Sequence, residues 1–180
     1  MTTTPLGHII TLGGDTMANN IKIIRDNLEL TQEQVSLLTG VPVKTLRNWE
    51  QEVRKPSDWT LDLVMDRILR VKMEEYSKAD ESNGILSFIT IKENVREVAK
   101  NYDIKRIYLF GSYIKGNAQE DSDIDLYMES SLFGLDYFGF AESLRSKLNK
   151  KIGLLSNKTV KQNSTIENEI FKTGVLIYER

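Results

Sequence analysis

Two aspartates separated by one residue, Asp123-Ile124-Asp125, form the part of this sequence best suited to chemistry. They open an apolar run, 126–128, that has the composition of a β-strand. Because successive side chains of a strand alternate between its faces, both carboxylates point to the same side. Two neighbouring carboxylates repel each other unless a cation lies between them. Carboxylate oxygens, together with substrate phosphates, are the ligands that Mg²⁺ prefers. The pair therefore indicates a site for a metal ion and a nucleotide.

A glycine–serine pair, Gly111-Ser112, precedes Asp123 by ten intervening residues and follows a second strand-like run, 107–110. Gly111 allows a tight backbone turn, and Ser112 offers a hydroxyl group and an N–H to a phosphate. Taken alone, these residues could also be a chance turn before an acidic surface loop. The strand-like runs on both sides of the spacing favour the nucleotide site.

The whole pattern, Gly111-Ser112, ten residues and Asp123-Ile124-Asp125, resembles the signature of the minimal nucleotidyltransferase (MNT) family, a branch of the polymerase-beta-like superfamily. The resemblance covers roughly the last hundred residues, a typical length for a small domain. It implies that Asp123 and Asp125 are catalytic and bind Mg²⁺ on ATP or another nucleoside triphosphate. It also implies that Gly111 and Ser112 bind the phosphates of this nucleotide.

One position departs from the family pattern. The resemblance implies a third carboxylate on the next strand, but the aligned stretch, 151–155, has Gly153 there. Glu129 has the strand parity of the two aspartates, but we do not expect it to replace the missing acid. The sequence therefore predicts nucleotide binding, while slow transfer and binding without chemistry both remain open.

The first third of the chain has the pattern of a helix-turn-helix. Thr31 and Gln34 form a capping box at the start of a short helix, 32–39, and Gly40 makes the turn into a second helix, 43–51. The segment from Leu30 to Ser57 resembles the phage-repressor, Cro-like (xenobiotic-response-element) class. By this resemblance the second helix enters the major groove of DNA. The predicted DNA-binding residues are Lys44, Arg47, Asn48, Arg54 and Lys55, of which Arg47 and Asn48 can read bases and the others can neutralise phosphates. A helix-turn-helix retained for protein contacts alone is the alternative.

Composition limits the remaining possibilities. Forty per cent of the residues are apolar, 28% are charged, and the net charge of −2 does not mark the whole molecule as a nucleic-acid binder. There is no cysteine, so disulfides and cysteine-based metal sites are excluded. No apolar run is long enough to cross a bilayer, and the first residues lack a basic signal sequence. We therefore expect a cytoplasmic protein without membrane contact.

The predicted fold class is α+β, with an all-α helix-turn-helix domain followed by a small α/β domain that has a mixed sheet. The expected segments are a disordered tail at 1–16, which contains His8, a DNA-binding domain at 17–71, a linker at 72–84 and the nucleotidyltransferase domain at 85–180; Met17 is a candidate start. In the aromatic stretch 132–140 we expect core packing, with a partner surface as the alternative.

Members of the MNT family often serve as antitoxins that silence a helical ribonuclease toxin of the HEPN type, either by transferring AMP to it or by binding it. The resemblance thus implies a DNA-binding antitoxin with operator DNA and a HEPN-type toxin as partners. A homodimer is expected because helix-turn-helix proteins commonly read paired half-sites. A repressor with a catalytically inactive nucleotidyltransferase domain is the first alternative, and a small-molecule nucleotidyltransferase is the second.

Overall fold

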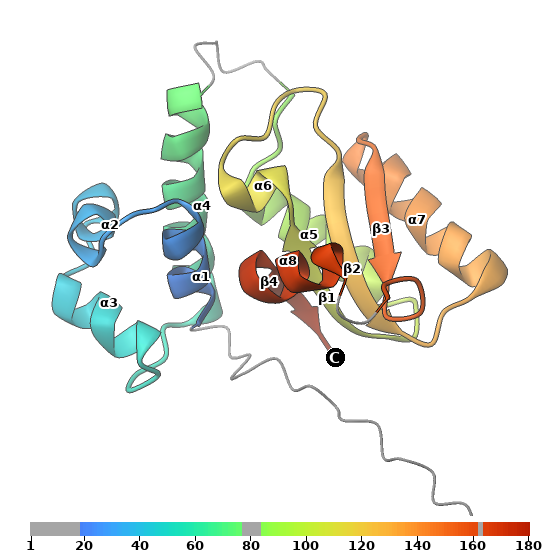
Figure 1. Ribbon diagram of the computed structural model, residues 1–180, viewed down its shortest axis with the longest axis horizontal. Helices are drawn as coiled ribbons and strands as arrows, with labels where there is room; N and C mark the ends of the chain where they lie inside the picture. Colours follow the sequence, from blue (N-terminus) through green and yellow to red (C-terminus); the bar gives the residue numbers. More distant parts are fainter. Residues whose placement is uncertain (1–18, 77–83, 162–163) are drawn as a thin grey trace, which may run out of the picture.

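The computed structural model describes residues 19–76, 84–161 and 164–180. The predictions about the tail at 1–16, His8, Met17 and most of the linker at 72–84 lie outside these residues. Within the described chain, helices and strands follow in the order α1 (Asn19–Asn27), α2 (Gln32–Thr39), α3 (Val43–Glu50), α4 (Asp58–Tyr76), α5 (Phe88–Ala99), β1 (Ile104–Phe110), α6 (Ser112–Lys115), β2 (Ile124–Ser130), α7 (Gly134–Leu148), β3 (Ile152–Ser156), α8 (Thr165–Thr173) and β4 (Val175–Glu179) (Figure 1). The predicted α+β class is confirmed.

The N-terminal helices form where the sequence signals place them. The Thr31 side chain accepts from the N–H of Gln34, and the Gln34 side chain accepts from the N–H of Thr31, which completes the capping box of α2. Gly40 ends α2 in the left-handed region, with φ of 74°, where glycine has no steric penalty. Leu46 of α3 is fully buried, so the second helix of the motif is anchored in the core.

The C-terminal part is a four-stranded mixed sheet in the order β3-β2-β1-β4. β1 is antiparallel to both β2 and β4, whereas β2 and β3 are parallel and are joined through α7. β1 and β2 are central and mostly buried, and β3 forms an edge beside β2. The residue that pairs with Asp125 on β3 is Gly153, and the residue that pairs with it on β1 is Phe110.

Helices cover the two faces of this sheet unequally. α5 and α7 pack on one face, where the buried residues include Leu109, Leu126 and Phe140. α8 packs on the other face, where Ile170 lies in a smaller buried cluster with strand side chains such as Tyr108 and Tyr127. In Figure 1, α8 lies in front of the sheet and α5 behind it. Because Asp125 has the parity of Tyr127, the acidic pair faces the side that carries α8.

The helix-turn-helix and the sheet are joined by direct contacts in addition to the chain connection. The side-chain amides of Asn20 and Asn27, both in α1, donate to the main-chain oxygens of Leu176 and Thr173 at 3.0 and 3.1 Å. Lys92 of α5 is 1% exposed and forms an ion pair with Asp62 of α4. A single hydrophobic cluster runs through both parts. The structure therefore holds α1 and α4 firmly against the nucleotidyltransferase sheet.

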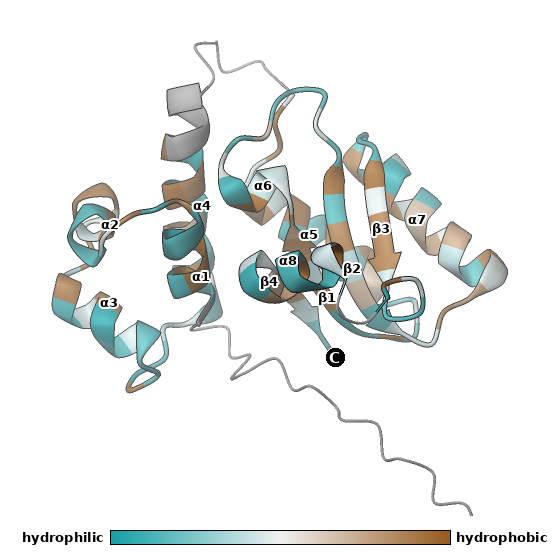
Figure 2. Cartoon of the chain, in the orientation of Figure 1, coloured by the Kyte–Doolittle hydropathy of each residue, from teal (hydrophilic) through white to brown (hydrophobic). Residues whose placement is uncertain are grey.

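After Gly111, residues 112–115 form the short helix α6. One local prediction is corrected by the structure. In the aromatic stretch, Leu132 and Phe140 are buried as expected, but core packing is wrong for three exposed side chains, Phe133, Leu135 and Phe138. These three side chains lie at the start of α7 and are 76%, 89% and 68% exposed. Figure 2 shows that the strands are largely apolar and that the loop leading into β2 is hydrophilic.

Among the described residues, no helix combines the length and apolar character that crossing a membrane would require.

Candidate nucleotide site and nucleic-acid interface

Gly111 and Ser112 connect the end of β1 to the start of α6. Gly111 has φ of 73° and ψ of −149°, a backbone conformation in which an L side chain would be strained. Ser112 then opens α6, and Gly116 closes it in the left-handed region with φ of 69°. The glycine–serine pair is thus presented at the end of a buried strand, beside the start of β2. This is the arrangement that the sequence pattern predicts, although the nucleotide-binding role of both residues stays a prediction.

The carboxylate of Asp125 occupies a space that exists because two neighbours are glycines. A Cβ built on Gly111 would lie 2.2 Å from Oδ2 of Asp125, and a Cβ built on Gly153 would lie 2.5 Å from Oδ1. Neither distance is compatible with real contacts, so side chains at 111 or 153 would displace the carboxylate. Gly153 therefore has a second consequence besides the absence of an acid. Because it lacks a side chain, the carboxylate of Asp125 has room beside β3.

Charge and burial act together on Asp125. Burial, then the neighbouring carboxylate of Asp123, and then that of Glu169 raise the pKa of Asp125 above its ordinary value, while the ammonium of Lys115 opposes the shift. A bound cation would relieve this excess of negative charge. The described residues contain no cluster of three or more His, Cys, Asp or Glu side chains placed to hold a metal ion. Two carboxylates on one strand face fit Mg²⁺ bound together with a nucleotide, whose phosphates supply further oxygen ligands.

Lys115 and Glu169 are site residues that sequence reasoning missed. The Nζ atom of Lys115, at the end of α6, lies 2.5 Å from Oε1 of Glu169 on α8. Lys115 falls inside the ten-residue spacing and could have been singled out as a cation near the phosphates. Glu169 carries no sequence signal, because only the packing of α8 on the sheet brings it next to residues that precede it by more than forty positions.

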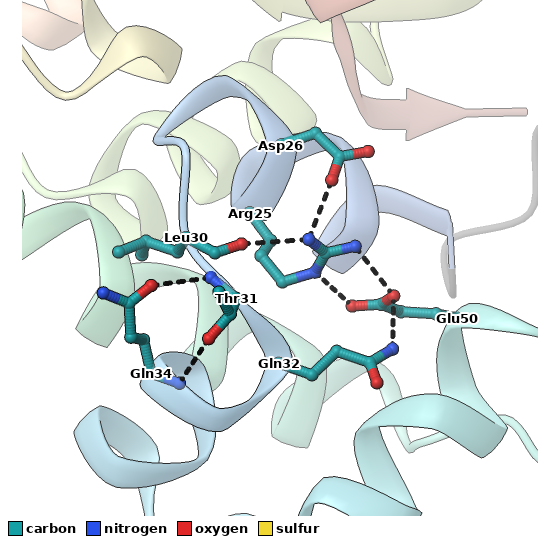
Figure 3. A network of polar contacts seen from close by, with 7 residues as sticks. All are labelled: Arg25, Asp26, Leu30, Thr31, Gln32, Gln34 and Glu50. Atoms are coloured by element: carbon teal, nitrogen blue, oxygen red, sulfur yellow. Dashed lines mark hydrogen bonds and ion pairs between the residues drawn. The ribbon is translucent and has the colours of Figure 1, made fainter.

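A polar network centred on Glu50 fixes the orientation of the candidate DNA-reading helix, α3. Arg25 of α1 donates from Nε to Oε1 of Glu50 at 2.7 Å and from a terminal nitrogen to Oε2 at 3.0 Å (Figure 3). Gln32 of α2 donates to the same carboxylate at 2.9 Å. Arg25 also donates to the main-chain oxygen of Leu30, and its pKa is raised chiefly by the hydrogen bond with Glu50. Three helices thus meet at one buried carboxylate at the end of α3.

The predicted DNA-binding residues lie on the outside of this unit. Lys44, Arg47, Arg54 and Lys55 are exposed, and Asn48 is half-buried. The main-chain oxygen of Asn48 accepts from the N–H groups of residues 53 and 54, at 2.9 and 3.2 Å, which closes the turn after α3. Four cations and one amide are therefore available on α3 and the following turn, and their contacts with DNA stay a prediction.

Comparisons with known proteins agree with both halves of this description. Residues 93–180 match the family described as polymerase beta, nucleotidyltransferase, and residues 21–66 match the helix-turn-helix family. A putative protein adenylyltransferase of Methanocaldococcus jannaschii is 32% identical over 72 residues, which cover 39% of this chain and 84% of that protein. The protein adenylyltransferase MntA of Thermococcus cleftensis is 28% identical over 68 residues, or 37% of this chain and 69% of that protein.

A solved structure described as a toxin–antitoxin with AMP-PNP superposes with a TM-score of 0.43 and 22% identity, over 49% of this chain and 73% of that one. The C-terminal part is a nucleotidyltransferase domain with a helix-turn-helix before it. The chain belongs to the MNT protein adenylyltransferase family of polymerase-beta-type nucleotidyltransferases.

Proposed function

We propose that this protein is a DNA-binding antitoxin whose nucleotidyltransferase domain binds Mg²⁺ and ATP and transfers AMP to a HEPN-type toxin. The observation that carries the proposal is that the carboxylate of Asp125 lies between Gly111 and Gly153, with Asp123 on the same strand face. It supports a role for both aspartates as ligands of Mg²⁺ on the triphosphate, and for Gly111 and Ser112 as phosphate-binding residues. The names of the adenylyltransferase relatives support AMP as the group transferred.

The proposed nucleotidyl transfer requires little covalent chemistry from the protein. Nucleotidyl transfer depends on holding the triphosphate, stabilising its charge and aligning an acceptor hydroxyl with the α-phosphorus. Mg²⁺, when bound, would neutralise negative charge on the phosphates and polarise the bond that breaks. The two aspartates would hold the metal–nucleotide complex at the end of β1 and the start of β2, on the sheet face that carries α8.

We further propose that the helix-turn-helix binds operator DNA as a homodimer in the cytoplasm, with base contacts from Arg47 and Asn48 and phosphate contacts from Lys44, Arg54 and Lys55. The exposure of the four cations supports this assignment. We keep 17–71 and 85–180 as the proposed domain limits. The direct contacts of α1 and α4 with the C-terminal part pack the two domains together.

A second candidate function is favoured by one observation, the glycine at the position of the third acid. With Gly153 opposite Asp125, the protein could bind nucleotide and toxin without transferring AMP. The double variant Asp123→Asn, Asp125→Asn separates the two candidates, because it removes both carboxylate charges while keeping the side-chain size. If transfer is the means of protection, the variant no longer rescues cells that express the toxin, yet still binds operator DNA in a gel-shift assay. Full rescue by the variant would favour protection by binding alone.

A separate measurement tests the nucleotide site itself. Calorimetric titration of the wild-type protein with ATP should show binding that requires Mg²⁺ and is lost in the double variant. Equal binding by the two proteins would mean that the aspartates do not hold the metal–nucleotide complex.

A further inference from the structure

The parallel strand next to the acidic pair cannot supply a third carboxylate. Gly153 is the residue in register with Asp125, and the rest of β3, residues 152–156, contains no acid. Glu129, the alternative on β2, lies four residues from Asp125, which is roughly 13 Å along a strand. Its carboxylate faces Arg106 at 3.6 Å, at the other end of the sheet. A third acid in this site must therefore come from another element.

Helix α8 brings one to the right face of the sheet. Ile170 is 2% exposed and packs among side chains of β1 and β2, including Phe110, the register partner of Asp125. The residue before it, Glu169, reaches the signature segment through its ion pair with Lys115, which lies four residues after Gly111. Glu169 thus lies on the side of the sheet toward which the acidic pair points, and its ion pair joins it to the segment between β1 and β2.

The backbone at Glu169 is held in place from several directions. Ser164 caps the start of α8 by accepting from the N–H of Glu167 at 3.2 Å. The hydroxyl of Thr173 donates to the main-chain oxygen of Glu169 at 2.9 Å, and the main-chain oxygen of Thr173 accepts from Asn27 of α1 at 3.1 Å. A fixed helix, together with the cation at Oε1, gives this carboxylate a defined position while its side chain remains 33% exposed.

We propose that Glu169 is the third acid of this site and that its carboxylate receives the hydroxyl group of the acceptor. It accepts a hydrogen bond from this hydroxyl and turns its oxygen toward the α-phosphorus of ATP. As the new oxygen–phosphorus bond forms, the bond from the α-phosphorus to the leaving oxygen breaks and pyrophosphate departs. The hydroxyl proton passes to Glu169. Lys115 positions Glu169 through their ion pair.

This assignment rests on the proposed function and supplies the third carboxylate that β3 lacks. The role proposed for Glu169 is directed at the acceptor and not at the metal. A group that orients an acceptor and takes its proton contributes to the rate of transfer and leaves the affinity for ATP unchanged.

The test is Glu169→Gln in the full chain, with the purified HEPN-type protein as acceptor and Mg²⁺–ATP as substrate. The matched control is Glu97→Gln, which breaks another lysine–glutamate pair of the same domain, with Lys147 at 2.7 Å, away from the acidic pair. We expect Glu169→Gln to slow AMP transfer on the order of 100-fold. Its KM for ATP and its Tm should match those of the wild type, and Glu97→Gln should transfer at the wild-type rate.

Three results would overturn the inference. An unchanged transfer rate in Glu169→Gln would show that its carboxylate does not act on the acceptor. A parallel loss of ATP affinity or of Tm would assign Glu169 a structural role between α6 and α8. If the wild-type protein transfers nothing to the acceptor, the proposed transfer activity fails and this assignment fails with it.

Discussion

Replacing Gly153 by alanine is the smallest change that disturbs the acidic pair without touching either aspartate. The added methyl group would lie 2.5 Å from Oδ1 of Asp125, whereas ordinary contacts begin at 3.4 Å, so this oxygen must move by about 0.9 Å. The opposite oxygen lies against Gly111, where even a Cβ has no room. The carboxylate therefore has to rotate away from both glycines.

The size of the effect follows from that displacement. A shift of about 1 Å in a group that positions the reaction can cost on the order of 100-fold in rate. Rotating Asp125 off its preferred conformation costs about 1 kcal/mol, which is small for the stability of a folded domain. We therefore expect Gly153→Ala to weaken Mg²⁺-dependent ATP binding and to slow AMP transfer roughly 100-fold, while the Tm changes by only a few degrees.

The matched control is Gly139→Ala in α7. A Cβ there meets only the hydroxyl group of Tyr102, at 3.7 Å, which is ordinary contact. Alanine is also the better helix former, by about 0.5–1 kcal/mol, so this variant should be at least as stable as the wild type and fully active. Calorimetric titration with Mg²⁺–ATP and a transfer assay compare the two variants. Wild-type ATP affinity and transfer in Gly153→Ala would refute the claim that the glycine makes room for the carboxylate.

Three further predictions concern stability and DNA binding. Lys92→Met leaves the carboxylate of Asp62 without its buried partner and should lower the free energy of unfolding, measured in urea, by about 3–5 kcal/mol. Lys147→Met, at a surface pair, should change nothing measurable. Equal urea unfolding curves for the two variants would contradict the importance of the buried pair. Thr31→Ala removes the capping box of α2 and should cost about 1 kcal/mol of unfolding free energy, while Thr31→Ser should keep it; an alanine variant as stable as the serine variant would speak against the cap. Arg47→Ala should weaken operator binding by about 1–3 kcal/mol in a gel-shift titration and relax the base preference at one position; unchanged affinity would remove Arg47 from the interface.

The elements whose signals are local could be predicted from the sequence. The capping box at Thr31, the turn at Gly40 and the strands on both sides of the signature could be predicted because each depends on residues within one turn or one strand. The two aspartates could also be predicted to share a face, since strand parity is fixed by the backbone.

The remaining features depend on packing between distant segments. Nothing local indicates that Glu169 pairs with Lys115 beside the signature segment, because this contact arises only when α8 covers one face of the sheet. The burial of Lys92 against α4 is equally invisible in sequence, where a lysine on a helix is normally solvated. The exposure of Phe133 and Leu135 differs from the prediction because an apolar stretch usually packs in the core.

The proposed AMP transfer is tested most directly by the intact mass of the HEPN-type acceptor after incubation with this protein, Mg²⁺ and ATP. If this site transfers AMP, the acceptor gains the mass of one or more AMP groups with the wild-type protein and stays unmodified with Asp123→Asn, Asp125→Asn. An acceptor of unchanged mass after incubation with the wild-type protein, under conditions where ATP binds, would contradict the claim that this site transfers a nucleotide.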